Sequence, residues 1–220
     1  MSQSLPKGIE LKAPLTREAV RQLRAGDIVY ISGQLWSADD RIFIGVFQKG
    51  RELPLDTKQY NAMLVARGFT MRIGDEWVPL HSTPVTTTGF RYAKWIPQAI
   101  RRFDLRMVSC KDGVSNDAET IRACKECDCV TTAVFAFPPK VVPHTCQEVA
   151  EVTWPEALQA GTMRLRETNF IYEANKYGPL VINIDTKGNC FMEEISQKVD
   201  ARAAQAYERM GIAGFEYAKM

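Results

Sequence analysis

The 220-residue sequence lacks several features that would assign it to a class at once. No apolar run approaches the roughly 18–20 residues that a membrane helix needs, so no transmembrane segment is expected. The N-terminus, which begins Met1-Ser2-Gln3, has no signal-peptide core, and we expect a soluble, cytoplasmic protein. Lys and Arg number 28 against 26 Asp and Glu, a balance that gives no reason to expect nucleic acid or a membrane as partner.

Histidine is nearly absent, since the chain has only His81 and His144. Such a chain has few ways to build a histidine-based metal site or a histidine-centred catalytic triad, and we expect both residues to be structural or on the surface. Cysteine is more frequent, with six positions: Cys110, Cys124, Cys127, Cys129, Cys146 and Cys190. In a cytosolic protein most of them should be reduced thiols.

The remaining composition is that of an ordinary globular domain. Hydrophobic residues make up 45% and charged residues 25%, which argues against disorder as the main state. Residues 1–15 are polar and contain Pro6 and Pro14, so we expect an extended N-terminal arm. Residues 16–220 show no repeat or linker and are expected to form a single domain.

Periodicity predicts alternating strands and helices of an α/β fold. The helices are expected at 17–24 (with Thr16 as N-cap), 92–103 (interrupted by Pro97), 116–127 (capped by Asn116) and 194–210. The strands are expected at 28–33, 62–66, 77–81, 105–108, 130–137 and 179–185, with a hairpin turn at 73–77 and another turn at 187–189. The alternation in the middle of the chain predicts parallel pairing with right-handed crossovers.

The segment Pro84-Val85-Thr86-Thr87-Thr88-Gly89-Phe90-Arg91-Tyr92 is the most unusual local sequence. Its threonines precede an expected helix start, and Arg91 falls in the first turn. Hydroxyl groups, backbone N–H groups at a helix start and a guanidinium together suit an anion. The alternative is a threonine-rich N-cap with a surface arginine.

A second candidate is Ser109-Cys110-Lys111-Asp112-Gly113, which follows the strand expected at 105–108. Ligands of α/β sheets favour the carboxyl ends of the strands. Lys111 could bind a carboxylate there, or act as an acid or base if buried. The alternative is an ordinary loop with a solvated lysine.

Taken in order, several segments resemble the β subunit, or C-terminal β domain, of iron–sulfur hydro-lyases: the class I fumarases and the L(+)-tartrate dehydratases. The similarity runs from about Leu23 to Asn189. Its motifs are an "aGDxVyxsG" opening (25–33), a "GDxW" hairpin (74–77), a "GPTTSxRM" loop (85–92), a "KGG" loop (111–113) and a "GPLxVxxDxxGN" strand and turn (178–189).

This resemblance implies a swivelling β/β/α domain with a mixed central sheet. It implies a lyase (a hydro-lyase) acting on a small hydroxy acid, as part of a heteromer that can be of higher order. A [4Fe–4S] cluster would lie on a separate α subunit and not in this chain. By position, Thr87 lies near proton transfer, Lys111 shares the catalytic role, and Thr88 and Arg91 bind substrate.

One family motif, "RDxxH", is altered. Asp39 stands at the position of its arginine and Phe43 at that of its histidine, while Asp40 is kept. Arg41 is the nearby substitute for substrate binding, although two residues along it need not point the same way. An Asp39 carboxylate would repel a substrate carboxylate. The change favours a substrate with one carboxylate fewer, or with an amine in its place. The chain also departs from the family at Val85 and at the bulky Phe135 and Phe137.

Two alternatives stand beside the enzyme hypothesis. The changes just described allow a non-catalytic binding or assembly module of the same fold. The spacing Cys124-x-x-Cys127-x-Cys129 allows a metal module, because thiolates at such spacing can hold zinc or part of an iron–sulfur cluster. No fourth ligand is apparent in sequence, and cysteines at the junction of a helix and a strand are commonly buried.

Overall fold

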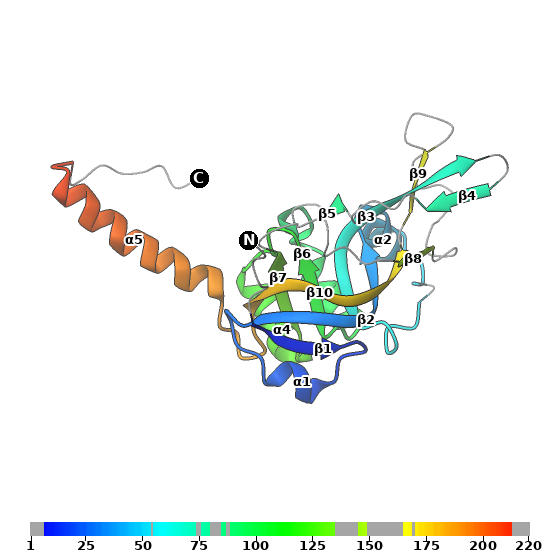
Figure 1. Ribbon diagram of the computed structural model, residues 1–220, viewed down its shortest axis with the longest axis horizontal. Coiled ribbons are helices and arrows are strands. Elements are labelled where there is room, and N and C mark those ends of the chain that lie inside the picture. The colour runs from blue at the N-terminus through cyan, green and yellow to red at the C-terminus, as the bar shows by residue number, and fades with distance from the viewer. Residues whose placement is uncertain are drawn as a thin grey trace, which may run out of the picture.

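The computed structural model describes residues 7–53, 55–73, 76–79, 85–86, 89–134, 145–148, 165–168 and 170–212. It has a mixed α/β fold in which the sheet contains both parallel and antiparallel strands, as the sequence predicted (Figure 1). None of the helices in this part of the chain combines the length and apolar character that crossing a bilayer requires.

The central sheet closes on itself. Strands β2 (Ile28–Ala38), β10 (Phe170–Ile184), β7 (Val130–Val134), β6 (Met107–Cys110) and β3 (Ala62–Ile73) pair in that order, and β2 also pairs with β3. The pairs β2–β3, β3–β6 and β6–β7 are parallel, whereas β10 is antiparallel to both β2 and β7. The result is a barrel-like circuit in which four strands point the same way.

Shorter strands extend this circuit. β1 (Ile9–Lys12), within the expected N-terminal arm, is parallel to β2. β4 (Glu76–Pro79), β5 (Val85–Thr86) and β9 (Leu165–Thr168) pair with β3, and β8 (Thr145–Glu148) pairs with β10. The β3–β4 pairing confirms the hairpin expected around 73–77.

Alternation along the strands creates two apolar layers. In β3, Ala62, Leu64 and Ala66 join one buried cluster, while Met63 and Val65 join the other. Successive side chains of a strand point to opposite faces, so a closed sheet has one cluster inside and one outside. The outer cluster, which contains Met63 and Val65, packs beneath helices α2, α3 and α4. The inner cluster also takes in the apolar side chains of the N-terminal segment: Leu11, Ala13, Leu15 and Val20.

The helices are short except for the last. Their bounds are α1 (Arg17–Arg21), α2 (Asp40–Phe43), the π-helical η1 (Ile44–Gln48), the 3₁₀ turn η2 (Gly89–Tyr92), α3 (Ile96–Arg102), α4 (Ala118–Cys127) and α5 (Phe191–Arg209). Thr16 caps α1 as predicted, because its hydroxyl accepts a hydrogen bond from Ala19 N.

Two helix predictions were wrong in detail. The helix expected at 92–103 is divided into η2 and α3, and Pro97 lies in the first turn of α3, where its missing N–H costs nothing, rather than at a kink. The helix expected to start at Asn116 is capped instead by Asp117, whose carboxylate accepts from Thr120 N at 2.8 Å. A carboxylate is an equally good cap and also complements the helix dipole.

The strands are mostly longer than predicted. Strands were expected at the apolar runs 28–33, 62–66 and 179–185. The corresponding strands β2, β3 and β10 extend well beyond these runs, because neighbouring strands are present to pair with the added residues. Ser109 and Cys110, expected in a loop, belong to β6. Residues 135–137 of the strand expected at 130–137, His81 and His144 lie outside the described residues, as does the side chain of Cys146.

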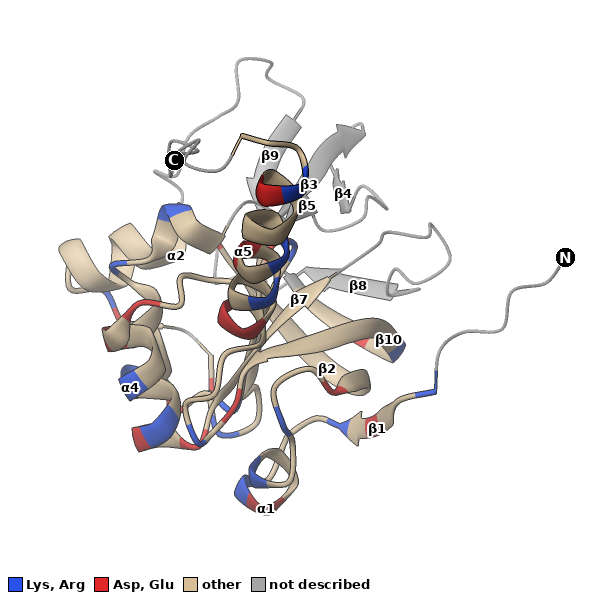
Figure 2. Cartoon of the chain, turned by 90° about the vertical axis from the view of Figure 1, so that its left-hand side faces the viewer, with Lys and Arg blue, Asp and Glu red and all other residues tan. Residues whose placement is uncertain are grey.

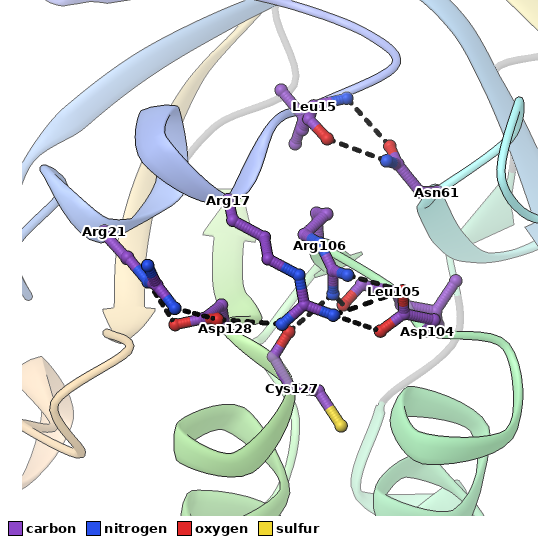
Figure 3. A network of polar contacts seen from close by, with 9 residues as sticks. All are labelled: Leu15, Arg17, Arg21, Asn61, Asp104, Leu105, Arg106, Cys127 and Asp128. Carbon is purple, nitrogen blue, oxygen red and sulfur yellow. Dashed lines mark hydrogen bonds and ion pairs between the residues drawn. The ribbon is translucent and has the colours of Figure 1, made fainter.

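A polar network fastens the N-terminal segment to the amino ends of the parallel strands (Figure 3). Asp128, two residues before β7, accepts from Arg17 and Arg21 of α1, at 2.9 Å and 2.7 Å. Asn61, directly before β3, exchanges two hydrogen bonds of 2.8 Å with the backbone of Leu15. This end of the barrel is therefore occupied by structural contacts.

Helix α5 differs from the others because it has no buried residue. It projects away from the barrel (Figure 1), and its Met192, Ile195 and Val199 are 44%, 37% and 56% exposed. Figure 2 shows acidic and basic residues interspersed on α4 and α5, in keeping with the small net charge. The amphipathic helix expected at 194–210 is thus present, and the apolar side chains of its first half are exposed.

Candidate functional site

The candidate residues gather at the carboxyl ends of the parallel strands, opposite the network around Asp128. Asp39 and Arg41 follow β2, and Lys111 follows β6. Because β2, β3, β6 and β7 run in the same direction, their carboxyl ends form one end of the barrel. This is the end at which α/β sheets bind ligands most often.

The turn that carries Arg91 contacts the loop that carries Lys111. A Cβ atom placed on Gly89 would lie 2.4 Å from the Gly113 carbonyl oxygen and 3.1 Å from Cys110 Sγ. Only glycine permits so close an approach of the two backbones. The structure therefore brings together two segments that are far apart in the sequence and that were both predicted to bind an anion.

Arg91 and Lys111 are both exposed at this junction. The Arg91 guanidinium lies 5.8 Å from the centre of the Tyr92 ring, and Tyr92 itself is buried. The ring gives the arginine a fixed base, which reduces the entropy lost when the guanidinium binds a ligand. Both cations are thus available to a small anion.

The local helix is weaker than predicted. Arg91 lies in η2, a 3₁₀ turn of four residues, and not in the first turn of a long helix. A single turn has a small dipole, so an anion at this point would depend on the side chains more than on helix electrostatics. Thr87 and Thr88, the other predicted residues of this segment, lie outside the described residues.

Cys110 lies at the centre of the junction, which sequence reasoning did not predict. Burial raises the pKa of its thiol to about 11, although hydrogen bonds from the backbone of Asp112, Lys111 and Gly89 act in the opposite direction. The group is therefore a neutral thiol at physiological pH. Its role in the structure is to fill the contact between the two loops.

Arg41 is not exposed as a surface cation. It forms a buried ion pair with Asp39, in which Nη2 donates to Oδ2 at 2.7 Å and Nε lies 3.1 Å from the same oxygen. The expectation that Asp39 would stand as a repulsive charge is wrong, because the guanidinium two residues along neutralises it. Asp39 also caps α2 by accepting from Arg41 N at 3.1 Å.

The cysteines near the end of α4 do not form a metal site. Cys124 and Cys129 are fully buried, Cys127 is partly exposed, and burial raises the pKa of both Cys127 and Cys129. Among the described residues, no three His, Cys, Asp or Glu side chains lie close enough to hold a metal ion. This finding opposes the metal-module alternative for Cys124, Cys127 and Cys129.

Comparison with curated proteins gives one consistent group of relatives. The chain is similar to β subunits of L(+)-tartrate dehydratases. It is 24% identical to that subunit of Escherichia coli over 184 residues, 84% of this chain and 86% of that protein. A Methanocaldococcus jannaschii protein assigned provisionally to the same subunit is 24% identical over 188 residues, 84% of this chain and 91% of that protein.

A longer relative aligns in part. A Geobacillus stearothermophilus protein assigned provisionally as a class I fumarate hydratase is 24% identical over 208 residues, which cover 91% of this chain but 36% of that protein. No protein-family model matches the chain.

Two of the motifs that carry the resemblance are explained by structure alone. The Asp185 carboxylate accepts hydrogen bonds from the backbone of Ala25, Lys187 and Asn189 and, at 2.7 Å, from the Asn189 amide. Gly26, at φ +91°, also donates to Ile182 O at 2.8 Å. The segments 25–33 and 178–189 thus hold each other through these hydrogen bonds.

Proposed function

We propose that this chain is the β subunit of a hydro-lyase that adds water to, or removes it from, a small hydroxy acid in the cytoplasm. The observation that carries the proposal is the contact of Gly89 with Gly113, since it joins the Arg91 turn to the Lys111 loop at the ligand-binding end of the barrel. Similarity to dehydratase β subunits over most of the chain supports the reaction class.

Dehydration removes a proton from one carbon and hydroxide from its neighbour, so the enzyme must hold the carboxylate and manage a proton. Arg91 offers the planar fork that matches a carboxylate, and Lys111 offers a compact ammonium beside it. Thr87 takes part in the proton transfer and Thr88 in substrate binding. Arg41 contacts the substrate from the end of β2.

The proposed partner is an α subunit that closes over this end of the barrel. We propose that it carries a [4Fe–4S] cluster, which when bound would supply a Lewis acid for the departing hydroxyl group. The described cysteines of this chain offer no such site, since no three potential ligands lie together among them. What this chain supplies is the binding of the carboxylate and the exclusion of water from one side.

Site variants in the complex with the partner test the assignment. Arg91→Ala and Lys111→Ala should each lower kcat/KM about tenfold to a hundredfold, because each removes a charged hydrogen bond to the substrate. Lys58→Ala, which removes an exposed cation from the 56–59 turn, is the matched control and should leave kcat/KM unchanged. Full activity in both site variants would refute the site.

One alternative keeps the fold without the reaction. A binding or assembly module would use the exposed apolar side chains in the first half of α5, Met192, Ile195 and Val199. Such a module would form a stable complex with its partner that has no lyase activity, and the two site variants would leave the complex unaffected.

A further inference from the structure

The buried pair of Asp39 and Arg41 has one feature that the fold does not explain. Arg41 Nε and Nη2 are bound to the Asp39 carboxylate, but Nη1 is buried and has no hydrogen-bond partner. The Arg41 side chain is only 6% exposed and that of Asp39 is 0% exposed. A buried N–H donor without an acceptor is unfavourable, and native structures seldom keep one.

The pair lies beside the candidate site. Arg41 belongs to α2, which follows directly on the carboxyl end of β2. Phe43 of the same helix packs on Tyr92 and Trp95, with ring centres 5.2 Å and 5.8 Å apart. Tyr92 is the residue next to Arg91. The helix that carries Arg41 therefore packs against the turn that carries Arg91, the residue proposed to bind the substrate carboxylate.

The charge of the pair limits which ligand groups can accept a hydrogen bond from Nη1. The Asp39 carboxylate cancels the charge of Arg41 at hydrogen-bond distance, so the pair is neutral as a whole. A second carboxylate brought to Nη1 would lose its hydration and would find no net positive charge to offset that loss. A neutral oxygen, such as that of an amide, hydroxyl or carbonyl group, would gain the hydrogen bond at a smaller cost in hydration. An amine would not, because Nη1 can only donate.

We propose that the Asp39–Arg41 pair is a specificity element in which Arg41 Nη1 donates a hydrogen bond to a neutral oxygen of the substrate. The substrate is then a hydroxy acid with a single carboxylate, held by Arg91 and Lys111, and a neutral oxygen group at its other end. The inference rests on the proposed function, because it needs those two cations to bind the carboxylate.

The test compares two ligands of the same shape. Malate has a carboxylate at each end, and its 4-monoamide replaces one of them with an isosteric neutral amide. Binding of each to the full chain is measured by NMR titration, and the ratio of the two dissociation constants is the readout. The wild-type chain should bind the monoamide more tightly than malate.

Asp39→Asn removes the neutralising charge but keeps an oxygen that can accept from Arg41. The variant should shift the ratio about tenfold towards malate, because Arg41 then keeps a net positive charge. Asp40→Asn is the matched control, since it removes a carboxylate from the next residue and should leave the ratio unchanged. A purely structural role for Asp39 would lower stability but would not reverse a preference between ligands.

A double variant covers the case in which Asp39→Asn does not fold. Asp39→Asn combined with Arg41→Met replaces the pair by neutral groups, a change that buried ion pairs often tolerate. It should abolish the preference for the monoamide. A wild-type chain that prefers malate, or a ratio that neither variant changes, would overturn the inference.

Failure of the proposed function has a different signature. Arg91→Ala and Lys111→Ala should weaken both ligands and leave their ratio unchanged. If neither variant weakens binding, or if wild type binds neither ligand, the carboxylate site is wrong and this inference falls with it. If both variants weaken binding but Asp39→Asn leaves the ratio as it was, only the specificity element is wrong.

Discussion

Asp128 binds both arginines of α1 with one carboxylate. The residue has a left-handed backbone with φ 53° and stands between the end of α4 and β7. Arg21 reaches both of its oxygens, at 2.7 Å and 2.8 Å, and Arg17 reaches one. The carboxylate therefore links the N-terminal segment to the barrel at the end opposite the candidate site.

Asp128→Asn should destabilise the chain by about 1 kcal/mol, since the two arginines are half exposed and solvent screens the pairs. Asparagine tolerates the left-handed backbone, so the change removes charge without adding strain. Hydrogen bonds from Arg21 and then Arg17 hold the pKa of Asp128 below its ordinary value. The stabilisation is thus present above the pKa of an unfolded aspartate and is lost as the pH falls through the lowered pKa of the folded chain.

Urea unfolding at neutral and acidic pH measures this contribution. The free-energy difference between wild type and Asp128→Asn should shrink in acid. Glu52→Gln, which removes an exposed carboxylate from a loop, should show no difference at either pH. A difference that persists when Asp128 is protonated would mean that shape, and not charge, gives the residue its role.

Cys110 should resist alkylation in the folded chain. Only the thiolate reacts, and burial, the largest influence on Cys110, raises its pKa to about 11. At mildly alkaline pH, iodoacetamide should label Cys110 more slowly than the partly exposed Cys127, and equally fast once the chain is unfolded. Peptide mapping by mass spectrometry follows both sites, and rapid labelling of Cys110 would show that the junction opens.

The role of a single residue was predictable from sequence where its interaction partner is close to it in the chain. Thr16 as a cap and the turn at 187–189 follow from neighbouring residues. Asp39 was misread because its partner, Arg41, is defined by how α2 turns after β2, and a sequence does not show that two side chains two residues apart will face each other. Cys110 was overlooked because its importance comes from Gly89, which is distant in the chain.

The periodicity of the sequence predicted the location of the helices and strands better than it predicted where they begin and end. Apolar runs located β2, β3, β6, β7 and β10, and the strand–helix alternation gave the parallel pairs. The antiparallel orientation of β10 between β2 and β7 was not predicted, because an almost continuous apolar run does not indicate the direction of a strand in its sheet. Closure of the circuit by β2 with β3 depends on pairing between distant strands, which local patterns do not contain.

Helix α5 gives a prediction at this scale. A helix of 19 residues with none buried has little tertiary packing to stabilise it, and isolated helices of this length are marginal in water. In the chain alone, amide hydrogens of α5 beyond its first turn should exchange orders of magnitude faster than those of β6 and β10. Hydrogen exchange with mass spectrometry measures this. Core-like protection of α5 would show that its exposed stripe is already covered, for example by another copy.

The whole molecule divides into two ends. Asp128 and Asn61 secure the amino ends of the parallel strands with hydrogen bonds and ion pairs, whereas the carboxyl ends present the exposed cations Arg91 and Lys111. The sequence alone suggested these cations through a family resemblance, and the structure adds the contact that joins their loops. Neither supplies the partner, because no residue pattern of one chain specifies a site completed by another.

The most direct test of the central claim is co-expression with the proposed α subunit, sought among the proteins encoded beside this chain. Purified without oxygen, the complex should dehydrate or hydrate a small hydroxy acid, and it should lose that activity in air. Each protein alone should be inactive. A stable complex that never shows lyase activity, or the absence of any complex, would contradict the account.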